Sequence, residues 1–423
     1  MNWDNIFKIL GKYTQLKHYN SIFETLNIKK SNSREKMANI LCEKATSNGF
    51  FGPELPEPVI KEWLNLHQID GNNYTFVYNL QENLPEGLLY NLYANRENYT
   101  QINLWDINPD NESEDLSIVM PKLNDILLTG IYQDKSNDSY TFSFVAPSVI
   151  SGSRIDGSTR LYKKLFFCHC VFYNSSKNVK VVLNPSANLH NVNGVKKNRY
   201  DWTPIANMIF NKAKDYVGQA LIYAPKWIPE ALYKFAEQAT NHNNPQITEA
   251  SFKAQESIEE FSNELLKVAN IDVDQEPALH NRLIQDIQFS YEAQLMEIHK
   301  TDEEDGEEVT IFKQRSDGIS HIISVESTEE GFRSGAAAQA ARRSRQDGLI
   351  DLLGVSLKTN DRAYKFLVEQ GIDAYLIRGT NTFVEERVVN IVIDRLNKYR
   401  EEIYFATQRD ESSRKTNFGS PSK

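Results

Sequence analysis

The chain has 423 residues, 47 basic and 57 acidic, with a net charge of −10 and a hydrophobic content of 40%. This apolar content excludes a wholly disordered chain, and the length indicates about two to four domains. No uninterrupted apolar run reaches the roughly 20 residues of a membrane span, and the N-terminus lacks the apolar core of a signal peptide. Three cysteines do not make a disulfide framework. We therefore expect a cytoplasmic protein that does not enter a membrane.

The acidity of the chain is concentrated in one segment. Residues 245–308 carry 17 acidic and 4 basic side chains, a balance of −13, whereas the balance is +2 over 309–423 and +1 over 1–244. The remainder of the chain is therefore close to neutral and can form local basic patches. The overall negative charge does not exclude a polyanionic partner.

The predicted fold class is α+β, with several domains in chain order. Residues 1–68 form a helical N-terminal region, in which Ile6, Ile9 and Leu10 recur at helical spacing. Residues 69–200 form a β-rich domain of short runs rich in β-branched and aromatic residues. These runs include QINLW and the two predicted strands of a hairpin, KLFFCHCVFY and VKVVL.

The second half of the chain begins with a helical segment over 201–300, in which helices are expected within 247–270 and 277–299. The acidic linker TDEEDGEE follows at 301–308. A C-terminal α/β domain is predicted over 309–406, and a flexible tail over 407–423. This domain is predicted to begin with the strands EVTIFKQ and ISHIISVE, joined by a turn at Arg315–Gly318, and to continue with an Ala-rich helix at 334–347. The strand GVSLKT, the helix NDRAYKFLVEQG closed by Gly371, the strand IDAYLIRG and a helix at 383–404 are predicted to follow.

Four common sequence motifs of nucleotide-binding and hydrolytic sites are absent from the sequence. It contains no G-x-x-x-x-G-K-[ST], no G-x-G-x-x-G after a strand, no H-E-x-x-H and no G-x-S-x-G. Cys168-His169-Cys170 resembles a metal site, but a structural zinc site needs four ligands and no second cysteine pair exists. On a strand the two thiols share one face and His169 points to the other, which favours a buried strand with small apolar thiols.

Basic residues next to aromatic ones, as in SGSRIDGSTRLYKK, are typical of surfaces that hold single strands through phosphate contacts and base stacking. A second basic group lies on or beside the Ala-rich helix. The alternative is a solvated surface next to ordinary core aromatics. The candidate nucleic-acid-binding residues are Arg160, Lys163, Lys164, Arg342, Arg343 and Arg345.

One C-terminal stretch resembles a known family. The hairpin RSDGISHIISVEST carries an aspartate near its turn and a glutamate at the end of its second strand, and GVSLKTNDRAYKFLVEQGIDAYLI follows as a predicted strand–helix–strand. This order resembles the core of restriction-endonuclease-like proteins, the PD-(D/E)xK group, and of their Mrr-type members. The resemblance covers about 100 of the 423 residues.

The resemblance implies an endonuclease in which two carboxylates hold Mg²⁺, the ion activates water, and a lysine lies near that water. Asp317 and Glu326 would be the metal ligands. The family has a lysine two residues after the glutamate, where this chain has Thr328, so Lys313 or Lys358 would take its place. Two alternatives are a relative that binds nucleic acid without cleaving it and an unrelated α/β domain in which Asp317 is a turn residue.

We therefore expect a prokaryotic protein that handles nucleic acid, with DNA as the expected partner, and the resemblance implies a role in restriction or phage defence. Mg²⁺ is expected only if the chain is an active nuclease. The alternative is a non-enzymatic assembly protein whose acidic helices dock a partner protein. A small-ligand sensor is a third interpretation, although the chain lacks a Gly-rich phosphate loop.

Overall fold

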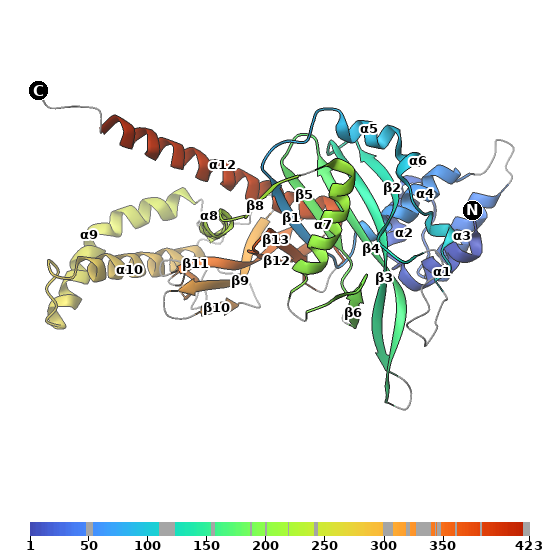
Figure 1. Cartoon of the computed structure of the whole chain (residues 1–423). Coiled ribbons are helices and arrows are strands. Elements are labelled where there is room, and N and C mark those ends of the chain that lie inside the picture. Colours follow the sequence, from blue (N-terminus) through green and yellow to red (C-terminus); the bar gives the residue numbers. More distant parts are fainter. Residues whose placement is uncertain are drawn as a thin grey trace, which may run out of the picture. The chain divides into compact units, whose positions relative to one another are not determined.

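Figure 1 shows the computed structural model of the chain. It describes residues 1–423 except 48–53, 110–122, 154–156, 187, 199–200, 219, 241–243, 299–307, 319–321, 327–339, 343, 345–347, 360–361, 381–382 and 418–423. The backbone alone is described for 296–297, 308, 317–318, 322–323, 348 and 406–417. The chain divides into two compact units: the first unit is 1–225 with 371–390, and the second unit is 226–370 with 391–423.

The first unit begins with the helices that the sequence predicts for 1–68. They are α1 (Trp3–Tyr13), α2 (His18–Thr25), α3 (Arg34–Thr46), α4 (Glu57–Leu66) and the short 3₁₀-helix η1 (His67–Ile69). Side chains stabilise two of the helix starts, because Asn2 accepts a hydrogen bond from the backbone of Asn5 and Ser33 accepts one from Lys36, each at 3.3 Å.

An antiparallel sheet forms the centre of the first unit (Figure 1). Its strands are β1 (Tyr74–Leu80), β2 (Leu127–Asp134), β3 (Ser139–Ser153), β4 (Thr159–Tyr173), β5 (Asn178–Leu183), β6 (Leu189–Val192), β7 (Val195–Lys196), β8 (Ile222–Tyr223) and β13 (Ala374–Gly379). The strand order is β13-β1-β5-β4-β3-β6-β7, with β2 paired to β3 and β8 paired to β1. The predicted hairpin is confirmed, since β4 pairs with β5 from Cys168 opposite Leu183 to Phe172 opposite Val179.

Helical elements interrupt and follow these strands. They are α5 (Leu88–Ala94), α6 (Arg96–Tyr99), the 3₁₀-helix η2 (Leu104–Asp106) and α7 (Thr203–Val217). The strand predicted at QINLW is therefore wrong, because Leu104–Asp106 turns as a 3₁₀-helix. A run of this length does not specify its own conformation, and its backbone contact with a strand is limited to Gln101 and Ile102, which both donate to the carbonyl of Leu128 on β2.

Both faces of the first unit's sheet are covered. On one face, Phe142, Phe144 and Phe172 pack with residues of α7 such as Phe210, which form the α7 core. On the other face, Val145, Leu165 and Phe167 pack with residues of the N-terminal helices, which form the N-terminal core. Covering on both faces explains why β3, β4 and β5 read as nearly continuous apolar runs rather than as alternating ones.

The second unit combines a smaller antiparallel sheet with long helices. Its elements are α8 (Ile228–Thr240), α9 (Pro245–Val268), α10 (Pro277–Ile298), β9 (Glu308–Gly318), β10 (Ile322–Glu326), β11 (Gly348–Lys358), β12 (Ala363–Glu369) and the larger part of α12 (Glu386–Asn417). Its strands follow the order β10-β9-β11-β12, and α8 packs against β9 and β11. The predicted helices at 247–270 and 277–299 are confirmed as α9 and α10, which pack against each other.

The helix predicted for NDRAYKFLVEQG is wrong. Residues 363–369 form β12, in which Tyr364, Phe366 and Val368 are buried at every second position. The strand pairs with β11 over its full length, from Ala363 opposite Lys358 to Glu369 opposite Leu352. Alanine, lysine, leucine and glutamate favour a helix locally, and the pairing with β11 overrides that preference. The strand–helix–strand order that contributed to the nuclease resemblance is consequently absent here.

Other C-terminal predictions are corrected or fall outside the description. The predicted turn at Arg315–Gly318 is wrong, because β9 continues to Gly318. The tail predicted from 407 is helical as far as Asn417, as part of α12. Most of the predicted Ala-rich helix at 334–347 lies outside the described residues, and its described residues 340–342 and 344 are helical. Most of the acidic linker predicted at 301–308 also lies outside the described residues. The mixed α and β content is confirmed, whereas the units differ from the division predicted from sequence.

Candidate functional sites

The two predicted metal ligands occupy different positions along the hairpin of β9 and β10. Glu326 lies opposite Lys313, and its Oε2 is 2.7 Å from Lys313 Nζ. The backbone of Asp317 lies opposite Ile322, four residues from Glu326 along β10. At roughly 3.4 Å per residue, the two backbone positions are about 13 Å apart along the strand. One Mg²⁺ holds its ligands at about 2.1 Å, so a shared ion would require the two side chains to close this separation between their backbone positions.

The predicted lysine positions are also separated. Lys313 is on β9 beside Glu326, whereas Lys358 is at the far end of β11, opposite Ala363. Leu349, the β11 partner of Asp317, is nine residues from Lys358, about 30 Å along the strand. Among the residues described, no group of three or more His, Cys, Asp or Glu side chains suits a metal ion. The catalytic and Mg²⁺ roles of these residues therefore stay predictions.

An ion-pair network that sequence reasoning missed joins three strands of the second unit. Arg315 on β9 donates from Nε to both carboxylate oxygens of Asp351 at 3.0 and 2.9 Å, and its Nη2 lies 3.0 Å from Glu369 Oε1. Hydrogen bonds from Arg315 to Asp351 raise the pKa of the guanidinium. Bidentate geometry fixes both partners, so the network registers β9, β11 and β12 against one another. We assign it a structural role.

The described part of the predicted Ala-rich helix is fixed to β9 by a buried polar contact. Gln314 Nε2 donates to the carbonyl of Ala341 at 2.9 Å and to Ser344 Oγ at 2.7 Å. The guanidinium of Arg342 then lies 4.3 Å from the ring centroid of Phe289 on α10. Arg343 and Arg345, the other predicted nucleic-acid-binding residues here, lie outside the described residues.

A groove of about 370 Å³ opens beside Arg342 in the second unit. It is lined by residues of α9 and α10, including the aromatic side chains of Phe252 and Phe289. Phe252 is 77% exposed. Opposite charges also meet in this groove, because Glu292 lines it together with Arg342. Sequence reasoning did not identify it, because its residues are distributed over α8, α9 and α10 and a segment about 50 residues further along the chain.

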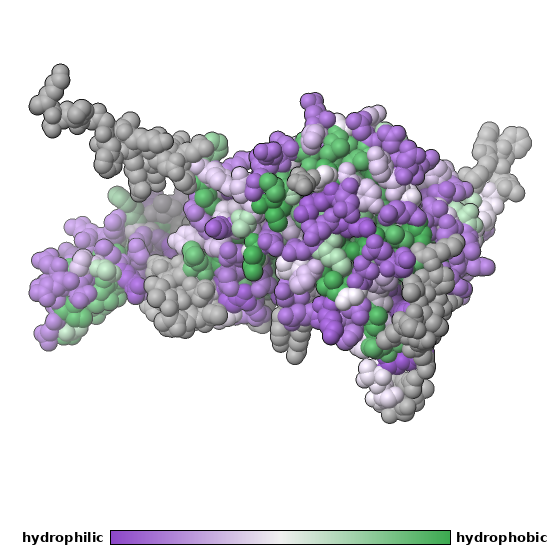
Figure 2. Space-filling model, viewed as in Figure 1, coloured by the Kyte–Doolittle hydropathy of each residue, from purple (hydrophilic) through white to green (hydrophobic). Residues whose placement is uncertain are grey.

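Hydrophobic side chains lie among hydrophilic ones over the end of the second unit where α9 and α10 meet (Figure 2). On α9, Phe261, Leu265 and Val268 are 51%, 41% and 83% exposed. Exposed apolar residues clustered in this way mark interaction surfaces more often than isolated ones do. This is the segment on which the docking of a partner protein was predicted, and that docking stays a prediction.

A second predicted basic group, in the first unit, lies along one edge of β4. The strand pairs with β5 only from Cys168 onward, so among the described strands β3 alone pairs with its first part. There, the guanidinium of Arg160 stacks at 4.9 Å over Tyr162, and the ammonium of Lys164 lies 5.2 Å from the ring centroid of Tyr13. We call Tyr13, Arg160, Tyr162, Lys163 and Lys164 the β4-edge cluster.

The β4-edge cluster is held in place by the adjoining backbone. The hydroxyl of Tyr13 accepts a hydrogen bond from the backbone N–H of Leu165 at 3.0 Å, which joins α1 to the first part of β4. Gly152 of β3 leaves room for Tyr162, because a Cβ at that position would come within 2.6 Å of the Tyr162 ring. The tyrosines therefore have fixed positions next to the cations.

Lys12 of α1 places a further positive charge near Lys164 of the β4-edge cluster. Burial and the nearby charge of Lys12 both lower the pKa of Lys164. Neither Lys163 nor Lys164 forms an ion pair with an acid in the part of the chain that the structure describes. The charges of Lys163 and Lys164 therefore contribute positive local potential, which favours an anionic partner.

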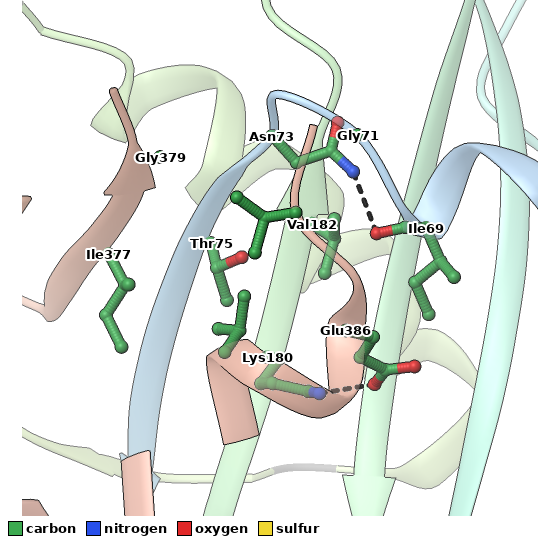
Figure 3. A pocket seen from close by; sticks show the side chains of 11 residues that line it. Ile69, Gly71, Asn73, Thr75, Lys180, Val182, Ile377, Gly379 and Glu386 are labelled. Carbon is green, nitrogen blue, oxygen red and sulfur yellow. Dashed lines mark hydrogen bonds and ion pairs between the residues drawn. The ribbon is translucent and has the colours of Figure 1, made fainter. Parts of the chain in front are cut away.

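The first unit also contains a buried ion pair that sequence reasoning missed (Figure 3). Lys180 on β5 is fully buried, and its ammonium pairs with Glu386 and donates to Asn390 Oδ1 at 2.7 Å. Burial alone would lower the pKa of Lys180, but the charge of Glu386 and the neighbouring Tyr173 raise it above its usual value. The signal was available, because a single lysine interrupts the apolar run VKVVL.

A row of buried histidines continues from this ion pair. His18 Nδ1 accepts from the backbone of Gln15 at 3.0 Å, so His18 Nε2 donates to the carbonyl of Asp70 at 3.0 Å. Burial lowers the pKa of His18 to about 4 and that of His169 to about 3, and it lowers that of His67 well below its usual value. All three are therefore neutral at pH 7.

Asp70 connects the histidines to α12. Its carboxylate accepts a hydrogen bond from the backbone of Glu386 at 2.8 Å, and burial raises the pKa of Asp70 to about 6. The cavity lined by Asn73, Lys180 and Glu386 has a volume of only about 10 Å³, far below the roughly 300 Å³ of small-molecule sites. We therefore interpret this polar cluster as structural.

The prediction for Cys168-His169-Cys170 is confirmed. Both thiols are fully buried in the α7 core, and His169 lies on the opposite face, where its Nδ1 is 3.1 Å from Ser143 Oγ. Burial raises the pKa of both thiols, which excludes a reactive thiolate at neutral pH.

Comparison of the chain with protein-family models, with curated proteins and with solved structures finds no match. Within the described residues, no helix has both the length and the apolar character needed to cross a membrane. A function must therefore be argued from the chain's own geometry.

Proposed function

We propose that this chain binds single-stranded nucleic acid through the β4-edge cluster. The observation that carries the proposal is the contact of two cations with two tyrosines at the first part of β4, Arg160 with Tyr162 and Lys164 with Tyr13 of α1. Cations supply phosphate contacts, and aromatic rings supply stacking surfaces that accept any base. The negative net charge of the chain does not oppose this binding, because the acidic excess belongs to residues 245–308.

The test is the salt dependence of binding, measured by fluorescence anisotropy with labelled single-stranded DNA, single-stranded RNA and duplex DNA. Each phosphate contact on a single strand contributes roughly −0.7 to the slope of log K against log salt. We expect the triple variant Arg160→Ala/Lys163→Ala/Lys164→Ala to weaken binding of every sequence and to reduce the slope by about 2.

The matched control is Lys29→Ala/Lys36→Ala/Lys135→Ala, which removes the same charge from exposed sites in the first unit. It should leave the slope within about 0.5 of the unmodified chain. The proposal is refuted if the unmodified chain binds none of the three probes at about 50 mM salt, or if the control loses as much affinity as the β4-edge variant.

Cleavage of the bound strand is a separate proposal, which rests on the resemblance of the β9–β10 hairpin to endonuclease cores. It predicts Mg²⁺- or Mn²⁺-dependent cleavage of DNA that is abolished by Asp317→Ala and by Glu326→Ala. Cleavage that survives both substitutions would show that these residues are not the metal ligands, and no cleavage with either ion would leave binding alone.

The assembly alternative is favoured by the exposed apolar residues of α9. A partner protein with basic groups around an apolar segment would match Leu265, Val268 and the acidic side chains beside them. Cross-linking of the full chain in cells tests this alternative. Cross-links from Lys253 and Lys267 to one protein, lost on Leu265→Glu/Val268→Glu, would support it, and their absence would count against it.

A further inference from the structure

The groove beside Arg342 has the dimensions of a ligand site. Its volume of about 370 Å³ falls within the roughly 300–1,000 Å³ that small-molecule sites occupy. It lies wholly within the second unit, between α9, α10 and the helical residues 340–342. It shares no residue with the β4-edge cluster.

The groove offers two aromatic surfaces to a planar ligand. Phe252 on α9 is 77% exposed and lines the groove. Phe289 on α10 lies under the guanidinium of Arg342. A ring placed on these side chains would remove apolar surface from water and add stacking contacts.

The charge in the groove is also arranged for a specific ligand. Arg342 forms no ion pair with an acid in the part of the chain that the structure describes. Its position is fixed, because the adjoining Ala341 carbonyl is held by Gln314. A guanidinium held on an aromatic ring at the edge of a groove is suited to receive a phosphate through paired N–H donors.

A hydrogen-bonded set of side chains also lines the groove. The hydroxyl of Ser251, which is 2% exposed, donates to Glu292 Oε1 at 2.5 Å, and Gln288 Nε2 donates to Ser251 Oγ at 3.0 Å and to Glu292 Oε1 at 3.2 Å. Carboxylate and amide oxygens are hydrogen-bond acceptors. These atoms suit the amino or ring N–H donors of a nucleobase.

We propose that this groove binds a single nucleotide, with its base on the aromatic side chains of Phe252 and Phe289 and its phosphate at Arg342. The groove joins a cation, stacking surfaces and fixed acceptors, and a nucleoside monophosphate has a complementary group for each. The inference does not rest on the proposed function, since each uses different residues in a different unit.

Isothermal titration calorimetry of the full chain with AMP, GMP, CMP and UMP tests the proposal, with the matching nucleosides and inorganic phosphate as partial probes. At least one nucleotide should bind, its nucleoside should bind about tenfold more weakly, and inorganic phosphate should give no signal, because both halves of the ligand contribute. Phe252→Ala and Arg342→Gln should each weaken the nucleotide about tenfold, and Arg342→Gln should abolish the difference between nucleotide and nucleoside.

Phe261→Ala is the matched control, because Phe261 is an exposed phenylalanine on the same helix that does not line the groove. It should leave binding unchanged, and circular dichroism should show that every variant is folded. The proposal is overturned if no nucleotide binds at about 1 mM, or if binding survives both groove substitutions. The triple variant of the β4-edge cluster separates the two proposals, because it should lose strand binding and retain the nucleotide.

Discussion

Removing the negative charge next to the buried lysine should strongly destabilise the first unit. Lys180 is fully buried, and Glu386 is 23% exposed at the start of α12. Glu386→Gln preserves the size of the side chain but removes its charge, which leaves an ammonium ion with neutral partners only. Breaking a buried pair from one side costs about 3–5 kcal/mol, a large part of the roughly 5–15 kcal/mol that stabilises a domain.

The two partners should respond unequally. Lys180→Met places an apolar side chain where the ammonium was, and Glu386 reaches water through its exposed part. We expect a loss of about 1 kcal/mol for Lys180→Met, and a loss for the double variant that is about 1–3 kcal/mol smaller than the sum of the single losses.

Urea unfolding followed by far-UV circular dichroism measures these free energies, with Glu97→Gln as an exposed control in the same unit. The control should change the free energy of unfolding by less than about 0.5 kcal/mol. A loss below about 1 kcal/mol for Glu386→Gln would refute the assignment of Lys180 as a buried cation, as would additivity in the double variant.

Two further predictions concern acid and the corrected strand. Below pH 6.5, His18 and His169 bind fewer protons in the folded state than in the unfolded state, because burial lowers their pKa values to about 4 and about 3. At pH 5, each of these histidines therefore lowers the free energy of unfolding by about 2 kcal/mol. Asp70, whose pKa is raised to about 6, opposes this effect by about 1 kcal/mol. Urea unfolding should therefore show a net loss of stability between pH 7 and pH 5. Unchanged stability would contradict the assignment of His18 and His169 as buried neutral histidines. Phe366→Ala, in the core of the second unit, should cost about 3–5 kcal/mol, and Lys365→Ala on the exposed face of β12 less than about 1; equal losses would contradict the alternation seen in this strand.

Patterns with a strong local physical cause were predictable from the sequence. In Cys168-His169-Cys170 the alternation of a strand alone places the thiols on one face and the histidine on the other, and the α7 core contains both thiols. The helices of the N-terminal region, α9 and α10 were predictable as well, because their apolar residues recur over several turns.

The candidate sites depended on contacts that local patterns do not encode. Arg160, Lys163 and Lys164 are close in sequence, so their clustering was predicted, but the participation of Tyr13 from α1 was not. The groove beside Arg342 was not predictable, because its aromatic residues come from two helices. Asp317 and Glu326 are near in sequence, yet the register of β9 and β10 separates their positions along the ladder.

The sequence by itself determined the mixed α and β composition, the helical N-terminal region, the β4–β5 hairpin and the separation of the acidic segment from the basic clusters. Periodicity and charge are local properties, and they are sufficient for these features. Only the tertiary structure decided that residues 363–369 are a strand, that Lys180 is a buried cation paired with Glu386, and that Arg342 lies over Phe289. The buried lysine and Arg342 depend on partners distant in sequence, whereas the strand at 363–369 depends on pairing with the preceding strand β11. In each case the contact decides between conformations that are nearly equal in local free energy.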